Sequence, residues 1–151
     1  MALKLPTVAD LVWLGDLKFA VTFPRERERN PEASSPRLLV DSAGLEGPSP
    51  VETLGAALAG CMSIDLAHIL NRGRHRVRAL RSRLVGARAP DDPHRLVAVS
   101  LHFVIDGDVP SDAVQRALQL SREKYCSVWH SLRTDISLEL TFDIVRSESG
   151  T

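Results

Sequence analysis

Several features are scarce in this sequence, and each scarcity argues against a class of protein. Charge of one sign is not in excess, because 19 basic residues face 19 acidic ones, so no overall field attracts nucleic acid or an anionic membrane surface. Four Phe, two Trp and one Tyr are too few for an extended base-stacking surface. No run of eighteen apolar residues is present. We therefore expect neither nucleic acid nor a membrane among the partners.

The start of the chain and its length narrow the class further. Residues 1–10, MALKLPTVAD, carry a single Lys and no continuous apolar stretch, so they do not resemble a secretory signal and we expect a cytoplasmic protein. A length of 151 residues suits one hydrophobic core, and we expect residues 1–151 to form a single domain. Two cysteines in such a chain are reactive thiols or inert core residues more often than a structural disulfide.

Alternating and β-branched residues predict several strands. Residues 10–23 contain two short runs rich in Val, Trp and Phe that Gly15-Asp16 interrupts, which is typical of a β-hairpin. The charged, proline-bounded residues 24–36 show no periodicity, so we expect a mobile surface loop there. Further strands are predicted at residues 37–41, 76–87, 95–105 and 136–145.

The clearest helix start in the chain lies at Ser49. Its hydroxyl can cap a helix, Pro50 suits the first helical position, and Glu52 completes a capping box. Residues 53–70 are apolar on nearly every side, which predicts a helix buried on every face that ends in a left-handed cap at Gly73. Because so short a chain has little else to cover this helix, we expect a second subunit to do so.

A second helical period covers residues 111–132. Ser111 is a possible cap, and the segment could form one bent helix or two. The order of elements is thus strands, buried helix, strand pair, helix and final strand. That order predicts an α+β fold with antiparallel pairing around a long central helix.

The two cysteines lie in these two helical segments. Cys61 falls in the middle of the apolar helix, and a single cysteine there is most often a small core residue. Cys126 has His130 four residues further on, hence on the same face if the helix continues, where an imidazolium would lower the thiol pKa. His130 is equally well explained as a surface residue of that helix.

Three chemistries can use these residues. Peroxide reduction needs one thiolate to attack the O–O bond and a second thiol to condense with the sulfenic acid. Thiol-dependent hydrolysis needs one cysteine, a base such as His130, and an oxyanion site. Metal binding could draw on Cys61, His68, Cys126 and His130, but these residues lack the close spacing of a zinc motif, so we expect no metal.

Two segments of the chain resemble the OsmC/Ohr family. Residues 47–66, GPSPVETLGAALAGCMSIDL, resemble the family's helix start followed by a cysteine-bearing helix. Residues 121–132, SREKYCSVWHSL, resemble its second-cysteine segment, and the intervening strands are in the expected order. The sequence around both cysteines is most similar to the YhfA-like branch. The likeness extends from about Leu11 to Val145.

This resemblance implies an OsmC-like fold, an intertwined homodimer, and thiol-dependent reduction of organic hydroperoxides. It implies that Cys61 is the peroxidatic thiol and Cys126 the resolving one, so that turnover passes through a disulfide. Glu52 matches the glutamate that orients a catalytic arginine in the family, although its capping role explains it equally well. An external dithiol would reset the enzyme, and no metal or organic cofactor is implied. Residues that bind the substrate are not assigned.

The catalytic arginine of the family comes from the N-terminal strands, but the predicted hairpin contains none. The available candidates are Arg25, Arg27, Arg29 and Arg37. A chain without this cation would be a catalytically weak redox-sensing or small-molecule-binding member of the same fold, which is the alternative function. Glu52 precedes Cys61 by ~13 Å along a straight helix, so the two can share a site only if the helix is interrupted or a partner chain supplies Glu52.

Overall fold

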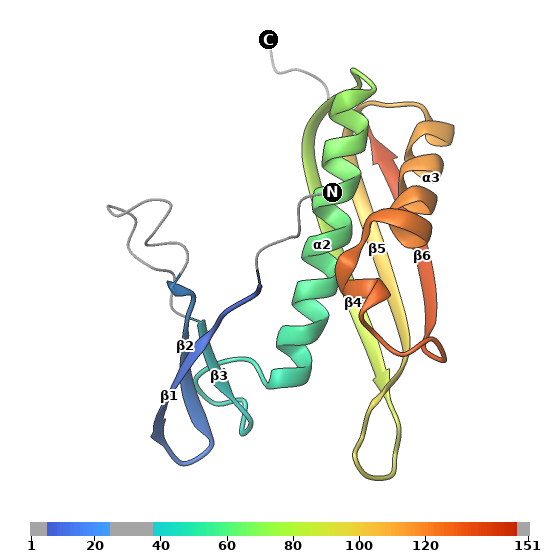
Figure 1. Ribbon diagram of the computed structural model, residues 1–151. Coiled ribbons are helices and arrows are strands. Elements are labelled where there is room, and N and C mark those ends of the chain that lie inside the picture. The colour runs from blue at the N-terminus through green and yellow to red at the C-terminus, as the bar shows by residue number, and fades with distance from the viewer. Residues whose placement is uncertain (1–5, 25–37, 148–151) are drawn as a thin grey trace. The chain divides into compact units, whose positions relative to one another are not determined.

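The computed structural model describes residues 6–24 and 38–147, and the chain divides into two compact units, residues 1–53 and 54–151 (Figure 1). The loop predicted at residues 24–36 lies outside the described residues except for Pro24. The four candidate arginines, Arg25, Arg27, Arg29 and Arg37, lie outside them as well. The single domain expected from the chain length stays a prediction.

The first unit contains a three-stranded antiparallel sheet in the order β1-β2-β3. Its strands are β1 (Asp10–Gly15), β2 (Lys18–Thr22) and β3 (Leu38–Asp41). The hairpin predicted at Gly15-Asp16 is confirmed, and both turn residues have positive φ, 101° and 47°. At the end of β3 the buried Asp41 carboxylate accepts backbone N–H groups from residues 43, 45 and 46. These bonds, that of Glu46 foremost, lower the pKa of Asp41.

Helix α2 (Pro50–Arg72) begins as the sequence predicts. The Ser49 N–H donates to Glu52 Oε2 at 2.8 Å and the Glu52 N–H donates to Ser49 Oγ at 3.2 Å, so the capping box is confirmed. The predicted left-handed cap at Gly73 is wrong by one residue. The Gly73 N–H still bonds the Ile69 carbonyl, so the reversal falls at Arg74, whose φ is 60°.

The second unit is built on the sheet β4-β5-β6, with strands β4 (Arg76–Arg88), β5 (Leu96–Asp108) and β6 (Ser137–Val145). β4 and β5 form the antiparallel pair that the sequence predicts. β6, however, runs parallel to β5, so the expectation of antiparallel pairing is wrong there. The reason is the helical crossover between the two strands, which returns the chain to the end of the sheet where β5 began.

That crossover contains three helical pieces, where the sequence left open one bent helix or two. They are α3 (Ser111–Leu120), a π-helical turn η1 (Ser121–Tyr125) and the short α4 (Ser127–His130). Ser111 is not the cap of α3: the cap position is Pro110, which makes no side-chain capping bond. Cys126 separates η1 from α4 in an extended conformation.

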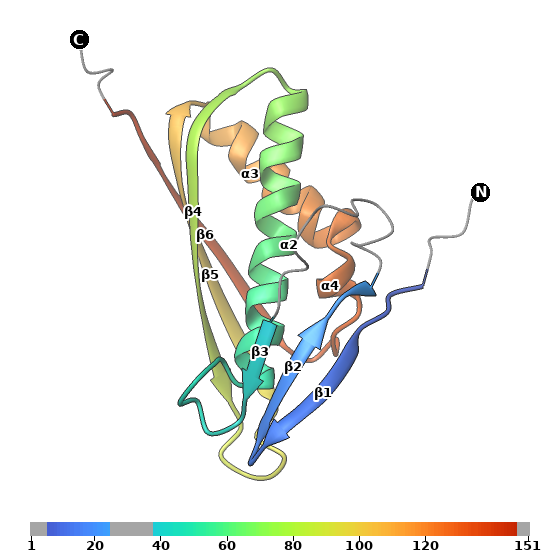
Figure 2. The same cartoon turned by 90° about the vertical axis from the view of Figure 1, so that its left-hand side faces the viewer.

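Helices α2 and α3 lie on the same face of the β4-β5-β6 sheet (Figures 1 and 2). A single stripe of α2 is buried, formed by Gly55, Leu58, Met62, Leu66 and Leu70. Fully buried residues of β5, Leu101, Phe103 and Ile105, complete the core. The expectation that α2 is buried on every face is wrong for the single chain, since Ile64 on another face is 70% exposed.

By length and composition, α2 is also long and apolar enough to cross a membrane, a test that the core helix of a soluble protein passes too. Small residues lie between the leucines of α2, so its large apolar side chains do not form a continuous run. The fully buried Leu66 and Met62 belong to the core of the second unit. This packing favours the core-helix interpretation.

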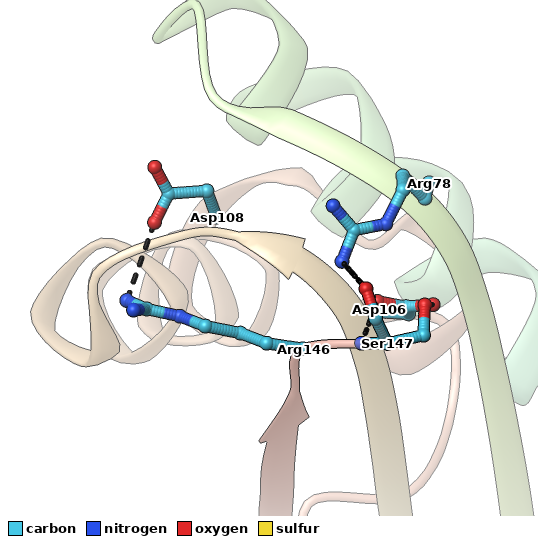
Figure 3. A network of polar contacts seen from close by, with 5 residues as sticks. All are labelled: Arg78, Asp106, Asp108, Arg146 and Ser147. Carbon is cyan, nitrogen blue, oxygen red and sulfur yellow. Dashed lines mark hydrogen bonds and ion pairs between the residues drawn. The ribbon is translucent and has the colours of Figure 1, made fainter. Parts of the chain in front are cut away.

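Polar contacts fasten the end of β6 to its neighbours (Figure 3). Arg78 Nη2 lies 2.7 Å from Asp106 Oδ1, and both the N–H and the hydroxyl of Ser147 donate to the Asp106 carboxylate. Arg146 pairs with Asp108 at 3.2 Å. The Ser147 hydroxyl and then Arg78 lower the pKa of Asp106. The lowered pKa favours the charged carboxylate that accepts these hydrogen bonds.

Candidate active site

The fold brings the two cysteines together. Cys61 lies in the middle of α2, and Cys126 lies 65 residues later between η1 and α4. Their sulfur atoms are within 4.8 Å of each other, and both thiols are free. Cys61 is half-buried, whereas Cys126 is completely buried. The pair that the sequence singled out therefore forms one site inside the second unit.

The local backbone explains how Cys126 reaches this position. Its N–H donates to the Ser121 carbonyl at 2.8 Å and closes the π-helical turn. The extended backbone of Cys126, with ψ at 97°, then ends the helical path and makes the residue the cap of α4. Its Sγ accepts the Trp129 N–H at 3.4 Å, as a serine oxygen does at an ordinary helix start.

Burial above all, with the neighbouring Cys61 and Asp65, raises the pKa of the Cys126 thiol to about 12, and the Trp129 N–H opposes the shift. Cys126 is therefore a neutral thiol in the reduced protein. Of the two cysteines, the half-buried Cys61 is better placed to meet a reagent from solvent.

Asp65 is a third member of the site that the sequence analysis missed. It follows Cys61 by four residues and so lies on the same face of α2. Its carboxylate is within 4.8 Å of both sulfur atoms and accepts the hydroxyl of the fully buried Ser121 at 2.7 Å. The local signal was weak: an acidic residue lies one turn beyond a cysteine in a largely apolar helix.

A hydroxyl also lies beside the thiols. Ser127 Oγ is 3.9 Å from Cys61 Sγ and belongs to the first turn of α4, directly after Cys126. The site thus contains two thiols, one carboxylate and two serine hydroxyls.

His130 does not act on Cys126 as the hydrolase hypothesis requires. Its ring Nε2 donates to the Arg122 carbonyl at 3.0 Å, and its side chain is exposed. Because the helix breaks at Cys126, the four-residue spacing does not place the imidazole against the sulfur. The expected shared face is therefore wrong.

Glu52 keeps the capping role described above, and α2 continues without interruption from Glu52 to Cys61. The interrupted helix, one of the two ways in which both residues could serve one site, is thereby excluded. A catalytic role for Glu52 stays a prediction that requires a partner chain. The candidate arginines lie outside the described residues, so their role stays a prediction too.

A metal ion would find three donors here, which differ from the four possible donors considered in the sequence. Within the described residues, Cys61, Asp65 and Cys126 form one group, which neither His68 nor His130 joins. Two thiols and a carboxylate suit zinc, but closed structural zinc sites have four protein donors. The expectation of no metal stays a prediction.

A cavity of about 520 Å³ adjoins the thiol site through Asp65. One wall is the face of α2 that carries Asp65, His68, Ile69 and Arg72, and the other contains Leu120 and Tyr125. Its mixed apolar and charged lining makes it the candidate substrate pocket.

Comparison with known proteins identifies the family. Residues 42–141 match the model of the OsmC-like proteins. The chain belongs to the OsmC-like family. This OsmC-like chain is 36% identical over 115 residues to the protein YhfA of Escherichia coli K12, a match that covers 75% of this chain and 86% of YhfA. The resemblance to the family and to its YhfA-like branch is confirmed.

Solved structures with the same fold include two informative ones. A hypothetical protein from Aquifex aeolicus matches with a TM-score of 0.82 at 22% identity and covers 96% of this OsmC-like chain and 100% of its own. A Legionella pneumophila protein described as an organic hydroperoxide resistance protein OsmC matches with a TM-score of 0.64 at 16% identity, covering 95% and 99% of the two chains. The expected OsmC-like α+β fold is confirmed, and the structure shows it with a long helix and two small sheets.

Proposed function

We propose that this protein is a cytoplasmic thiol peroxidase that reduces organic hydroperoxides to alcohols. The Cys61 thiolate attacks the distal oxygen of ROOH, the O–O bond breaks, and Cys61 becomes a sulfenic acid. The alkoxide leaves and takes up the proton that the Cys61 thiol had released, which gives ROH. The Cys126 sulfur then displaces hydroxide from Cys61 to form a disulfide, and the Cys126 proton completes a molecule of water. An external dithiol reduces the disulfide and restores both thiols.

The observation that carries this proposal is the approach of two free thiols to within 4.8 Å in one site. A disulfide needs the sulfurs to move to about 2.05 Å, which a side-chain rotation and a small shift of the irregular segment around Cys126 can supply. The unequal burial of the thiols supports the order of events: the half-buried Cys61 meets the peroxide, and the buried, neutral Cys126 resolves.

An organic rather than an inorganic peroxide is supported by two findings. The cavity beside Asp65 includes Ile69, Leu120 and Tyr125, which suit an apolar substrate tail. The Legionella pneumophila protein of the same fold is described as an organic hydroperoxide resistance protein.

The proposed assembly is a homodimer. The apolar side chain of Ile64 is exposed, which supports a second subunit that covers this face of α2. On one continuous helix, Glu52 cannot reach Cys61 of the same chain. In such a dimer, the partner subunit can supply both Glu52 and an arginine to the site. No metal or organic cofactor is part of the proposed cycle.

The second candidate is a redox-sensing or small-molecule-binding member of the fold. It is favoured by the Asp65 carboxylate, which lies close to both sulfurs and raises the pKa of the Cys126 thiol. Such a protein would form the same disulfide, but slowly and with little turnover.

The test is the amount of hydroperoxide that reduced protein consumes without a reductant. One equivalent per subunit should disappear, faster with tert-butyl hydroperoxide than with hydrogen peroxide, and two thiols should be lost. The Cys61→Ser variant should consume none, because the attacking thiol is gone. The matched variant Cys126→Ser should still consume one equivalent and stop at the sulfenic acid.

Retention of both thiols after incubation with excess hydroperoxide would rule out the peroxidase. A burst that is complete only after hours, with little turnover on added dithiol, would favour the redox-sensing candidate.

A further inference from the structure

Asp65 lies beside the two groups between which a proton must move during disulfide formation, the Cys126 thiol and the hydroxide on Cys61. Its carboxylate is within 4.8 Å of both Cys61 Sγ, which carries the departing hydroxide, and Cys126 Sγ, which carries the proton that the hydroxide requires. The three groups come from two separate segments, α2 and the break between η1 and α4. Because Asp65 lies beside both reacting sulfurs, it can serve both halves of the transfer.

The orientation of Asp65 is fixed by a buried partner. The hydroxyl of Ser121, a residue with no exposed surface, donates to Asp65 Oδ2 at 2.7 Å. The same Ser121 accepts the Cys126 N–H through its carbonyl at 2.8 Å. Ser121 therefore links the carboxylate and the resolving cysteine through consecutive hydrogen bonds, so that both are held in register.

The resolving step needs a base because Cys126 is neutral and buried. A thiol attacks as a thiolate, and a completely buried sulfur has little access to hydroxide from solvent. Among the described residues, the His130 ring is committed to the Arg122 carbonyl and does not serve Cys126. Asp65 is the acceptor that the structure places beside the sulfur.

We propose that Asp65 is the proton acceptor that carries the Cys126 proton to the hydroxide leaving Cys61, an inference that rests on the proposed function. As the Cys126 sulfur attacks the Cys61 sulfur, the S–H proton passes to Asp65 while the S–O bond breaks. Asp65 then protonates the departing hydroxide to water and regains its charge. The Cys126 sulfur supplies the electron pair of the new S–S bond, the electron pair of the broken S–O bond leaves with the hydroxide, and the carboxylate is unchanged at the end.

A purely electrostatic role would have the opposite sign. The Asp65 charge raises the pKa of Cys126, so its removal alone would increase the thiolate fraction and speed disulfide formation. Loss of a proton acceptor would slow the same step. The direction of the change therefore separates the two roles.

The test compares Asp65→Asn, Asp65→Glu and Ser121→Ala in reduced, full-length protein. Asparagine keeps an oxygen that accepts the Ser121 hydroxyl but cannot take the proton, whereas Ser121→Ala removes the hydrogen bond and keeps the carboxylate. After one equivalent of tert-butyl hydroperoxide, sulfenic acid is trapped with dimedone and disulfide is followed by mass spectrometry. Asp65→Asn should form disulfide at least about tenfold more slowly than wild type and accumulate trapped sulfenic acid.

The Asp65→Glu variant should recover a large part of the rate, and Ser121→Ala should lose less than Asp65→Asn. Disulfide formation by Asp65→Asn at or above the wild-type rate would overturn the proposal. So would a Glu variant as slow as the Asn variant, provided that both unfold at the wild-type temperature.

The same variants are also treated with the thiol oxidant diamide, which forms an adduct on Cys61 and leaves as its hydrazine when Cys126 attacks. A slow second step in Asp65→Asn with diamide, in a protein that consumes no hydroperoxide, would support Asp65 and reject the peroxidase. A normal second step with both oxidants would reject the role of Asp65 and leave the peroxidase standing.

Discussion

Cys126 shows how one residue can combine a structural and a chemical task. Its sulfur caps α4 by accepting the Trp129 N–H, and its backbone ends the π-helical turn. Burial at this position raises the thiol pKa and favours the protonated form, which in the proposed cycle leaves the reaction with the peroxide to Cys61. In the same proposed cycle, burial protects Cys126 from solution oxidants until Cys61 has reacted.

The raised pKa of Cys126 predicts a pH-dependent stability. In the unfolded chain the thiol titrates near its ordinary value of 9.0, and in the folded chain burial and the neighbouring Cys61 and Asp65 raise the pKa to about 12. The folded state therefore holds the proton more tightly. Its contribution to stability is fully present below pH 9 and is lost as the pH rises toward 12.

Urea unfolding of the reduced protein at pH 7.5 and pH 10 measures this effect. The free energy of unfolding should fall more for wild type than for Cys126→Ser, which lacks the titrating thiol but shares the other titrations. An equal fall in the two proteins would contradict the assigned burial effect.

Asp65 was missed for a residue-scale reason. An acidic side chain on a helix is usually solvated, and its spacing from Cys61 acquires meaning only when a distant segment brings Cys126 and Ser121 to the same face of α2. Tertiary contacts of this kind cannot be deduced from local periodicity.

At the scale of elements, local patterns predicted what local forces decide. The β1-β2 hairpin and the start of α2 follow from Gly15-Asp16 and from the capping box at Ser49, and both are confirmed. The break at Cys126 was not resolved because residues 121–125 keep a helical pattern up to the point where the backbone extends. The parallel β6 was missed because strand direction depends on the crossover rather than on the strand itself.

The two candidate helix caps give a matched pair of predictions. Replacing Ser49 with Ala removes the hydroxyl that accepts the Glu52 N–H, so thermal or urea unfolding should show a loss of about 1 kcal/mol. Ser111→Ala is the control, since Ser111 follows the cap position Pro110 and the start of α3 has no side-chain capping bond. Equal effects of the two substitutions would contradict the assigned caps.

At the scale of the whole molecule, the site is assembled by topology. α2 supplies Cys61 and Asp65, and the crossover between β5 and β6 supplies Cys126, Ser121 and Ser127. Both α2 and the crossover lie on the sheet face that carries the core, so the packing of that core holds the two sulfur atoms in place (Figure 1). The family resemblance identified the cysteines in advance, whereas the surrounding polar groups required the fold.

The proposed dimer belongs to the same scale. One chain buries a single stripe of α2 and leaves Ile64 exposed, while Glu52 lies two and a half turns before Cys61 on an uninterrupted helix. A second subunit accounts for both features, because it would cover the apolar face and could supply the charged groups that one chain cannot bring to its own thiol.

The most direct measurement is peptide mapping by mass spectrometry of the protein after one equivalent of tert-butyl hydroperoxide, without reduction. We predict that the peptides containing Cys61 and Cys126 are joined by a disulfide within a single chain, and that dithiothreitol separates them. Oxidation of Cys61 to sulfinic acid while Cys126 stays free, or a disulfide only between chains, would contradict the account.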